Sequence, residues 1–331
     1  MAAESIVNGA GAEQLSLPGV DAYFLTQRLV ESRRIVREIA AKSKLPLFIQ
    51  FSGGRDSMAM LGLVQEVTDN YICTYMATGL EFKGVIPFVK ETCRKLGARL
   101  MISNPGMHKG NLFKRIETFQ SFPGLIATWC CRDLKLRPQK KMLIQVFGKG
   151  TFYKLEGIRL SESVRRKYMY KEYTGNPIRE DGEFRGSYEV FPIINWTDRD
   201  VLNYLEMKGL PTMRHYQEFG LSGCAFCPFY QPDIYKQVLG KYPDYPLYKR
   251  VIEWENRLDK PSVGGYYFLR DIKREILTGV RAVPVAPIQE AASPCMMMFE
   301  GEMVLTCNVY GHTFLGGECV RCKEPAPEPV S

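Results

Sequence analysis

The sequence predicts an α/β protein: a parallel, twisted sheet with helices on both faces, followed by a helical region and a small zinc-binding tail. Apolar runs rich in β-forming residues alternate along the chain with stretches whose apolar residues recur at helical spacing. Strands that alternate with helices in this way form parallel sheets covered on both faces. A short, glycine-rich C-terminal stretch that contains several cysteines predicts the tail.

The first predicted element is an amphipathic helix at 21–43. The central strand is expected at 47–51, and a helix begins directly after a Ser-Gly-Gly turn. Thr197 is a candidate N-cap of a helix that ends near Gly209. The other predicted strands are 71–77, 98–102 and 151–157, and the other predicted helices are 84–96, 111–119, one after Cys131, 233–239, 245–258 and 266–277.

Composition sets the class of protein. The chain has 331 residues, of which 45% are hydrophobic and 24% charged, as is usual for globular proteins. No apolar run reaches the roughly 18 residues of a membrane span, and the first residues lack the plan of a signal peptide. We therefore expect a cytoplasmic protein without a membrane partner. In that reducing compartment its ten cysteines are expected to be metal ligands or reactive thiols rather than disulfides.

Positive charge is concentrated in one segment. Between Cys131 and Lys171, twelve basic residues stand against three acidic ones, a net charge of 12 − 3 = +9. Such a segment favours a polyanionic partner, either nucleotide phosphates or a nucleic-acid backbone. The alternative is a solvated basic face.

The stretch Ser52-Gly53-Gly54-Arg55-Asp56-Ser57 is the strongest candidate for a binding site. Glycines let the backbone turn sharply, so that its N–H groups and the new helix N-terminus face an anion, here a phosphate. The lysine-bearing phosphate loop is absent. The alternative is a glycine turn with an Asp/Ser helix cap.

Two further segments are expected to face the same cleft. Thr78-Gly79-Leu80-Glu81 follows the second strand, and ligands of parallel sheets bind at the carboxyl ends of strands. The segment 157–166 carries Arg159, Ser163 and Arg165, which are suited to oxyanions. We expect ATP phosphates over Ser52, Gly53, Gly54, Asp56 and Ser57, with Asp56 placing Mg²⁺. We expect adenine and ribose near Phe51 and the turn that includes Thr78, Gly79 and Glu81, with Arg159 and Arg165 reaching the oxyanion and Ser163 adding a donor.

The first cysteine constellation combines Cys130-Cys131 with Cys224-x-x-Cys227. Four thiolates in two pairs can hold zinc or a [4Fe–4S] cluster, and spacing alone does not choose between them. Adjacent cysteines point in different directions, which suits a cluster with separated corners better than one small ion. The alternative is two buried cysteines and a redox C-x-x-C pair.

The second constellation is Cys307, His312, Cys319 and Cys322, on a segment too short to bury a core. A Cys₃His zinc site would supply the missing folding free energy. The alternative is that Cys319 is a reactive thiol. Cys295 has no defined role.

The loop resembles the SGGxDS signature of PP-loop ATP pyrophosphatases, which cleave ATP between its α and β phosphates. Over about residues 45–230 the chain resembles the phosphoadenosine phosphosulfate (PAPS) reductase-like family of PP-loop proteins. The matching motifs are the loop, the 78–81 turn, Trp129-Cys130-Cys131-Arg132-Asp133-Leu134-Lys135, Gly157-Ile158-Arg159 with Ser163, Arg165 and Arg166, Pro192-Ile193 with Trp196, Asp200 and Val201, and Gly223-Cys224 with Cys227-Pro228.

The resemblance implies an adenine nucleotide alpha-hydrolase-like sheet. It also implies a [4Fe–4S] cluster on Cys130, Cys131, Cys224 and Cys227, the arrangement of the family's adenylylsulfate reductases. Those reductases usually have a degenerate loop and end in Glu-Cys-Gly-x-His, whereas this chain has an intact loop and Glu318-Cys319-Val320-Arg321-Cys322. Relatives that pair an intact loop with cluster cysteines include a sulfur-transfer component of DNA phosphorothioation systems and iron–sulfur tRNA thiolases.

Three functions remain open at this point. The first is ATP-dependent sulfur transfer to a nucleic acid, tRNA or DNA, with a sulfur-donor protein such as a cysteine desulfurase and a homodimer as further partners. The second is reduction of PAPS or adenylylsulfate to sulfite. The third is a non-catalytic nucleotide-sensing module. The predicted domains are a mobile tail (1–20), the PP-loop domain with its iron–sulfur cysteines (21–230), a helical extension (231–282), a linker (283–294) and the zinc-binding tail (295–331).

Overall fold

The computed structural model describes residues 18–125, 128–213, 218–219 and 223–285, together with four short strands between residues 296 and 319. For residues 18–24 and for those four strands it describes the backbone alone. The tail predicted at 1–20 lies outside the described residues up to residue 17. The predicted linker lies outside them from residue 286 onward.

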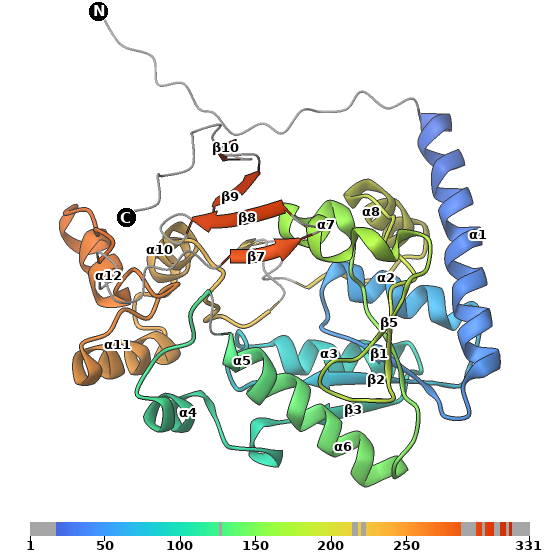
Figure 1. Cartoon of the computed structure of the whole chain (residues 1–331), viewed down its shortest axis with the longest axis horizontal. Coiled ribbons are helices and arrows are strands. Elements are labelled where there is room, and N and C mark those ends of the chain that lie inside the picture. The colour runs from blue at the N-terminus through green and yellow to red at the C-terminus, as the bar shows by residue number, and fades with distance from the viewer. Residues whose placement is uncertain are drawn as a thin grey trace, which may run out of the picture.

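Six strands form one sheet in the order β3-β2-β1-β4-β6-β5 (Figure 1). Neighbouring strands pair in parallel, except that the edge strand β5 runs antiparallel to β6. The four predicted strands are confirmed as β1 to β4, whereas β5 and β6 are additions. The strands are β1 (Leu47–Gln50), β2 (Tyr71–Met76), β3 (Leu100–Ser103), β4 (Tyr153–Leu155), β5 (Ile178–Glu180) and β6 (Tyr188–Val190).

Helices cover both faces of this sheet, as predicted (Figure 1). Because side chains alternate along a strand, Phe48 of β1 packs in a cluster with Leu143 of α6, whereas Ile49 belongs to the larger core with Val36 of α1 and Leu61 of α2. The helices of this part are α1 (Pro18–Lys42), α2 (Arg55–Gln65), α3 (Val85–Lys95), α4 (Leu112–Phe119), α5 (Trp129–Cys131), α6 (Arg137–Phe147), α7 (Val164–Tyr170) and α8 (Asp198–Met207).

Shorter turns connect these elements, and one of them is a π-helix, η2 (Arg132–Leu136), directly after the paired cysteines. The 3₁₀ turns are η1 (Pro105–Met107), η3 (Leu160–Glu162) and η4 (Lys171–Thr174). The segment 157–166, expected as a loop, therefore includes η3 and the start of α7. The predicted cap of α8 is present: the Asp200 N–H donates to the Thr197 hydroxyl at 3.2 Å, and the Thr197 N–H donates to the Asp200 carboxylate at 2.6 Å.

Three helices follow the sheet at the predicted positions. They are α10 (Pro232–Lys241), α11 (Pro246–Leu258) and α12 (Leu269–Thr278). Tyr235 and Tyr248 join them to the main core. The fully buried Glu255 of α11 accepts hydrogen bonds from the first N–H groups of α12, at 2.6 Å from Leu269 and 2.9 Å from Arg270, which satisfies donors that a helix start leaves without partners.

A second, antiparallel sheet contains the four C-terminal strands, in the order β10-β9-β8-β7. Its register places Cys307 opposite His312, and Cys319 opposite Phe314. Cys322 and Cys295 lie outside the described residues, so zinc binding by this tail stays a prediction. The strands are β7 (Met296–Phe299), β8 (Glu302–Cys307), β9 (His312–Leu315) and β10 (Glu318–Cys319).

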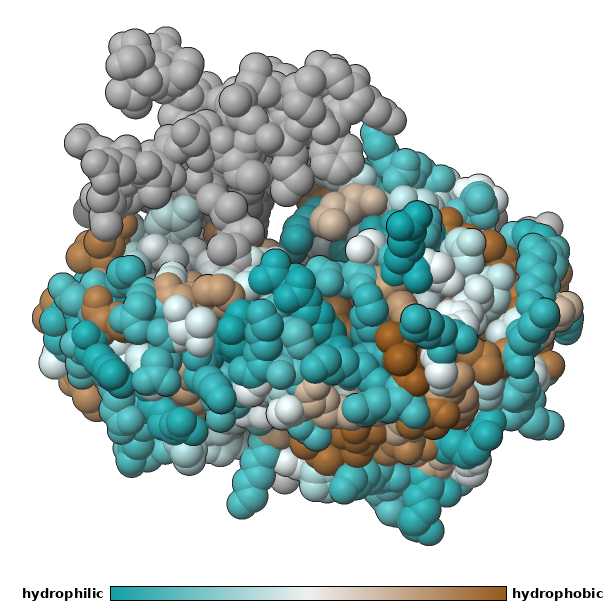
Figure 2. Space-filling model, turned by 60° about the horizontal axis from the view of Figure 1, so that its bottom comes forward, coloured by the Kyte–Doolittle hydropathy of each residue, from teal (hydrophilic) through white to brown (hydrophobic). Residues whose placement is uncertain are grey.

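The surface in Figure 2 is mostly hydrophilic, with a band of hydrophobic residues near its lower edge. In the described part of the chain, no helix combines the length and the apolar composition needed to cross a bilayer.

Candidate active site

The segment Ser52–Ser57, called the phosphate loop below after the ligand expected there, follows β1 and runs into the first turn of α2, where the sequence predicts it. Gly53 has a φ of +80°, a left-handed conformation that favours glycine. Gly54 is the N-cap of α2 and offers no side chain to bind the first N–H groups of the helix. The Ser57 hydroxyl donates to the Gly54 carbonyl at 2.9 Å and accepts from the Ser52 N–H at 3.2 Å. The loop is thus braced from within, and its helix N-terminus can receive an anion.

A cavity of about 450 Å³ opens over this loop. It is bounded by the start of α2 on one side and by the residues that follow β4 on the other. Four carboxyl groups and three guanidinium groups line it. They are Asp56, Glu156, Glu162 and Asp198, and Arg55, Arg159 and Arg166.

Arg159 connects the two sides of the cavity. Its side chain is buried, with 1% of its surface exposed. The Nε atom donates to Asp56 of α2 at 2.8 Å, and an Nη atom donates to Asp198 of α8 at 2.7 Å. The predicted oxyanion contact of Arg159 would therefore involve a guanidinium group that already binds two carboxylates.

The turn after β4 packs directly on the loop helix. A Cβ atom on Gly157 would lie 2.8 Å from the carbonyl carbon of Asp56 and 3.0 Å from the Ser57 nitrogen. Only a glycine leaves room for that approach. Glu156, the residue before it, also lines the cavity. Burial, followed by the charge of Glu189, raises the pKa of the Glu156 carboxyl to about 7.

A smaller cavity of about 60 Å³ adjoins the loop at the ends of β1 and β2. Its lining includes Phe51, Glu81, Lys135 and Cys224. The Glu81 carboxylate accepts hydrogen bonds from the Thr78 hydroxyl at 2.8 Å and from the Gly79 N–H at 2.9 Å, which holds the predicted 78–81 turn in place. Gln50 and Ser52 line both cavities, so the two cavities adjoin one another at these residues.

The four predicted cluster cysteines gather beside this smaller cavity. The hydrogen bond with Cys131 and burial raise the pKa of the Cys130 thiol, and the nearby charges of Cys131, Cys227 and Cys224 raise it further. A hydrogen bond from the Cys130 thiol lowers the pKa of Cys131 to about 6, against burial and with help from the charge of Lys135. Burial raises the pKa of Cys227 to about 11. The Thr78 hydroxyl lies 3.4 Å from the Cys224 sulfur.

Within the described residues, no group of three or more His, Cys, Asp or Glu side chains has the spacing that a single metal ion requires. The four thiols are nevertheless a donor set that fits an iron–sulfur cluster, whose cysteines sit at separate corners.

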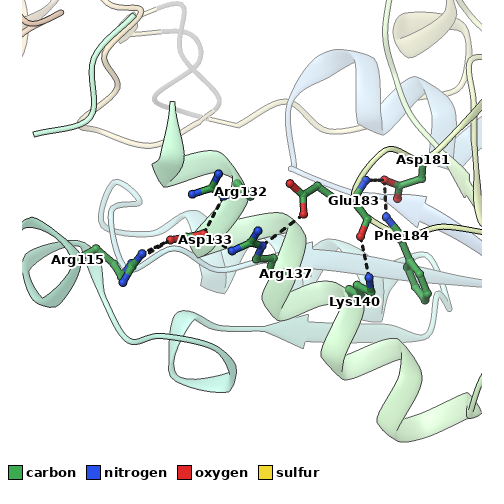
Figure 3. A network of polar contacts seen from close by, with 8 residues as sticks. All are labelled: Arg115, Arg132, Asp133, Arg137, Lys140, Asp181, Glu183 and Phe184. Atoms are coloured by element: carbon green, nitrogen blue, oxygen red, sulfur yellow. Dashed lines mark hydrogen bonds and ion pairs between the residues drawn. The ribbon is translucent and has the colours of Figure 1, made fainter. Parts of the chain in front are cut away.

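A buried carboxylate, Asp133, lies two residues after the paired cysteines and is surrounded by arginines (Figure 3). Asp133, fully buried in η2, accepts hydrogen bonds from Arg115 at 2.6 and 2.9 Å. It also pairs with Arg132 at 3.1 Å and Arg137 at 3.2 Å. Such a network holds the backbone of η2, and with it the direction of Cys130 and Cys131. Isolated π-helical turns are frequent at functional sites.

Two predicted residues lie away from the large cavity. The Ser163 hydroxyl caps α7 by accepting from the Arg166 N–H at 3.2 Å. Arg165 is exposed, its guanidinium carbon lies 4.3 Å from the centre of the Phe229 ring, and its charge acts on Cys131. It therefore lies nearer to the cysteines than to the phosphate loop.

Glu156, Lys135 and Asp198 line the two cavities but were not among the predicted site residues. Glu156 directly precedes the Gly157-Ile158-Arg159 motif, and Lys135 is the fourth residue after Cys131, so their positions beside motifs were the available signal. Asp198 follows the helix cap Thr197, and nothing in the sequence connects it with Arg159.

The profile of the family described as "Phosphoadenosine phosphosulfate reductase domain" matches residues 46–230, more than half of the chain. The chain belongs to this family. This family member is 27% identical over 208 residues to an uncharacterized protein of Methanocaldococcus jannaschii, an alignment that covers 62% of this chain and 47% of that protein. It is also 27% identical over 200 residues to adenosine 5'-phosphosulfate reductase 2 of Bacillus subtilis, covering 58% and 76% of the two chains. The chain thus spans about half the length of the archaeal relative.

Two solved structures resemble the family member. PAPS reductase from Candida auris matches with a TM-score of 0.44 and 17% identity, over 65% of this chain and 97% of that one. A U34-tRNA thiolase from Methanococcus maripaludis, solved with its [4Fe–4S] cluster, matches with a TM-score of 0.43 and 18% identity, over 72% and 80%.

Proposed function

We propose that this PAPS reductase family member is a PP-loop enzyme that binds ATP, releases pyrophosphate and transfers sulfur to an adenylated nucleic acid. The observation that supports this most is that the two cavities adjoin one another, with Gln50 and Ser52 in both linings. One cavity lies over the phosphate loop and the other reaches Cys224. A nucleotide bound across both would bring its reacting centre near the thiols.

In this proposal the loop N–H groups and the α2 N-terminus bind the β and γ phosphates, and Asp56 holds Mg²⁺. The adenosine lies beside Phe51 and Glu81, where the smaller cavity of about 60 Å³ must widen to take it. An acceptor oxygen attacks the α-phosphorus, the bond to the bridging oxygen breaks, and pyrophosphate leaves with the electron pair. A sulfur nucleophile supplied by a donor protein, such as a cysteine desulfurase, then displaces AMP from the acceptor carbon.

Cys130, Cys131, Cys224 and Cys227 would hold a [4Fe–4S] cluster. When bound, the cluster would supply a site at which the incoming sulfur is held or its redox state set. The low pKa of Cys131 favours the thiolate form that a ligand requires.

The proposed nucleic-acid contact is α7. Of the twelve basic residues counted in the sequence, several are neutralised: Arg132 and Arg137 by Asp133, Lys154 by Asp181 and Arg159 by Asp56. Arg165 and Lys167 of α7 are exposed. They flank Arg166, which lines the cavity of about 450 Å³ over the phosphate loop, called the phosphate cavity below. Helix α7 therefore offers cations to the backbone of a nucleic acid whose acceptor group lies in the site.

A second candidate function is reduction of adenylylsulfate to sulfite, which the names of relatives such as the Bacillus subtilis protein favour. Anaerobically purified protein separates the candidates. Sulfur transfer predicts pyrophosphate release that increases when RNA or DNA is added, with iron present at four atoms per chain. Sulfite formation from adenylylsulfate with thioredoxin, and no effect of nucleic acid, would replace the proposal with the reductase. Nucleotide binding without turnover would leave a sensing module.

Charge reversal of α7 tests the acceptor class directly. Arg165→Glu with Lys167→Glu should weaken RNA or DNA binding by about tenfold or more, since two phosphate contacts are lost. Lys141→Glu with Lys149→Glu, at two exposed positions of the same basic segment, is the matched control, because it reverses the same number of charges. Equal binding by both variants would contradict a nucleic-acid contact at α7.

A further inference from the structure

Glu156 occupies a distinctive place at the phosphate cavity. The register of β1 and β4 pairs Phe48 with Lys154 and Ile49 with Leu155. Glu156 is therefore level with the end of β1, where the phosphate loop begins. Its side chain lines the same cavity as Ser52 and Ser57, and the next residue, Gly157, touches the backbone of the loop helix.

Glu156 differs from the other carboxyl groups of the cavity in its partners. Asp56 and Asp198 both pair with Arg159, and Glu162 pairs with Arg166 at 3.1 Å. No hydrogen bond or ion pair to the Glu156 carboxylate is present among the residues that the structure describes. The side chain is thus available to a ligand.

The charges around Glu156 come from several elements. Glu189 of β6, Lys154 of β4, Arg179 of β5 and Arg166 of α7 all act on it. The two strand cations are already engaged, however. Lys154 pairs with Asp181, and Arg179 pairs with Glu189. From the cavity side, Asp56, Glu162 and Asp198 add negative charge, and Arg55 and Arg159 add positive charge.

A polyphosphate entering this cavity brings only negative charge and hydrogen-bond acceptors. An ionised Glu156 would repel it, whereas the neutral acid has an O–H group to donate. The raised pKa, about 7, means that the carboxyl group is partly protonated at neutral pH before any ligand arrives. Little free energy is then needed to protonate it fully.

We propose that Glu156 is a nucleotide-binding residue that takes up a proton when a polyphosphate binds and donates it in a hydrogen bond to a phosphate oxygen. This inference rests on the proposed nucleotide site. It assigns a role that differs from that of a metal ligand, because a carboxyl group that binds Mg²⁺ releases a proton instead of taking one up.

The test is titration calorimetry with α,β-methylene ATP and Mg²⁺, since this nucleotide binds but cannot be cleaved between its α and β phosphates. Measurements in two buffers of different ionisation enthalpy give the number of protons exchanged. At about pH 7.5, the wild-type protein should take up about three quarters of a proton per nucleotide, the difference between a group that is about one quarter protonated and one that is fully protonated. Its affinity should fall by up to about tenfold per pH unit above roughly pH 7.5.

Glu156→Gln keeps a hydrogen-bond donor of the same shape, so it should bind the nucleotide without proton uptake and with an affinity that does not change with pH. Glu180→Gln, at an exposed position of β5, is the control and should behave as the wild type. Proton release, or equal uptake by wild type and Glu156→Gln, would overturn the role of Glu156 while leaving the nucleotide site intact. A complete absence of nucleotide binding to the wild type would overturn both. If Glu156→Gln does not fold, absence of proton uptake by the wild type still overturns the role, and uptake that is lost in Glu162→Gln would assign the proton to Glu162 instead, whose pKa burial also raises.

Discussion

Gly157→Ala should disable the phosphate site while changing a single methyl group. The added Cβ would lie 2.8 Å from the carbonyl carbon of Asp56, 3.0 Å from its oxygen and 3.0 Å from the Ser57 nitrogen. All three are backbone atoms in the first turn of α2, so no side-chain rotation can relieve the contact. Overpacking of this kind costs about 1–3 kcal/mol. Because the displaced atoms belong to the phosphate loop, a shift of a few tenths of an ångström also misplaces its N–H groups.

We expect Gly157→Ala to lower the free energy of unfolding by about 1–3 kcal/mol and to weaken binding of α,β-methylene ATP by about tenfold or more, which corresponds to 1.4 kcal/mol or more. Urea unfolding and titration calorimetry measure the two effects. Gly182→Ala is the matched control, because its Cβ would meet no atom within 4 Å and its backbone does not have a positive φ. The close packing of the β4 turn on α2 would be refuted if both variants unfolded and bound nucleotide like the wild type.

Four further predictions follow from the same structure. Gly54→Val should abolish ATP binding in a folded protein, as checked by calorimetry and circular dichroism; unchanged affinity would remove the loop assignment. Deletion of residues 291–331 should remove zinc and leave iron and its visible absorbance, whereas loss of both metals would contradict two separate centres. Asp133→Asn leaves buried Arg115 without its counter-ion and should cost about 3–5 kcal/mol of stability, with reduced iron content as the second readout; full stability and iron would show that this ion-pair network is dispensable. Glu156→Gln should gain stability relative to the wild type as pH rises. A carboxyl group whose pKa is raised in the folded state stabilises the wild type at low pH, and this contribution to the free energy of unfolding is lost between about pH 4.5 and about pH 7. Urea unfolding at about pH 4.5 and about pH 8 should show a relative gain of about 1–3 kcal/mol, and no change in the difference between the two proteins would contradict the raised pKa.

The central strands and most helices could be predicted because their patterns are local. Apolar runs mark β1 and β2, and helical spacing marks α1 and α11. The strands β5 and β6 were not predicted, although the equally short β4 was. In a sequence, charged residues such as Arg179 and Glu189 indicate exposed positions. In the structure they form an ion pair with one another, and Glu189 is buried.

The candidate site, too, could be predicted from the sequence only in part. Glycines and cysteines with fixed spacing identified the loop and the thiols, because their chemistry depends on neighbours in the chain. Charge pairing depends on partners far along it: Arg159 is 103 residues from Asp56 and 39 from Asp198. A net charge counted over a segment therefore overstates what is offered to solvent, and the sequence could not show that Arg159 is buried or that Glu156 faces the phosphate cavity.

The phosphate cavity contains both carboxylate and guanidinium groups, and this mixture affects which anions can bind there. Arg159 and Arg166 already have carboxylate partners, so a lone sulfate or inorganic phosphate must compete with groups that are in place, and gains little by entering. A polyphosphate that arrives with Mg²⁺ brings a cation for those carboxylates as well as oxygens for the loop N–H groups. On the proposed function, these ion pairs make the cavity selective, because they disfavour abundant small anions and favour a metal–nucleotide complex.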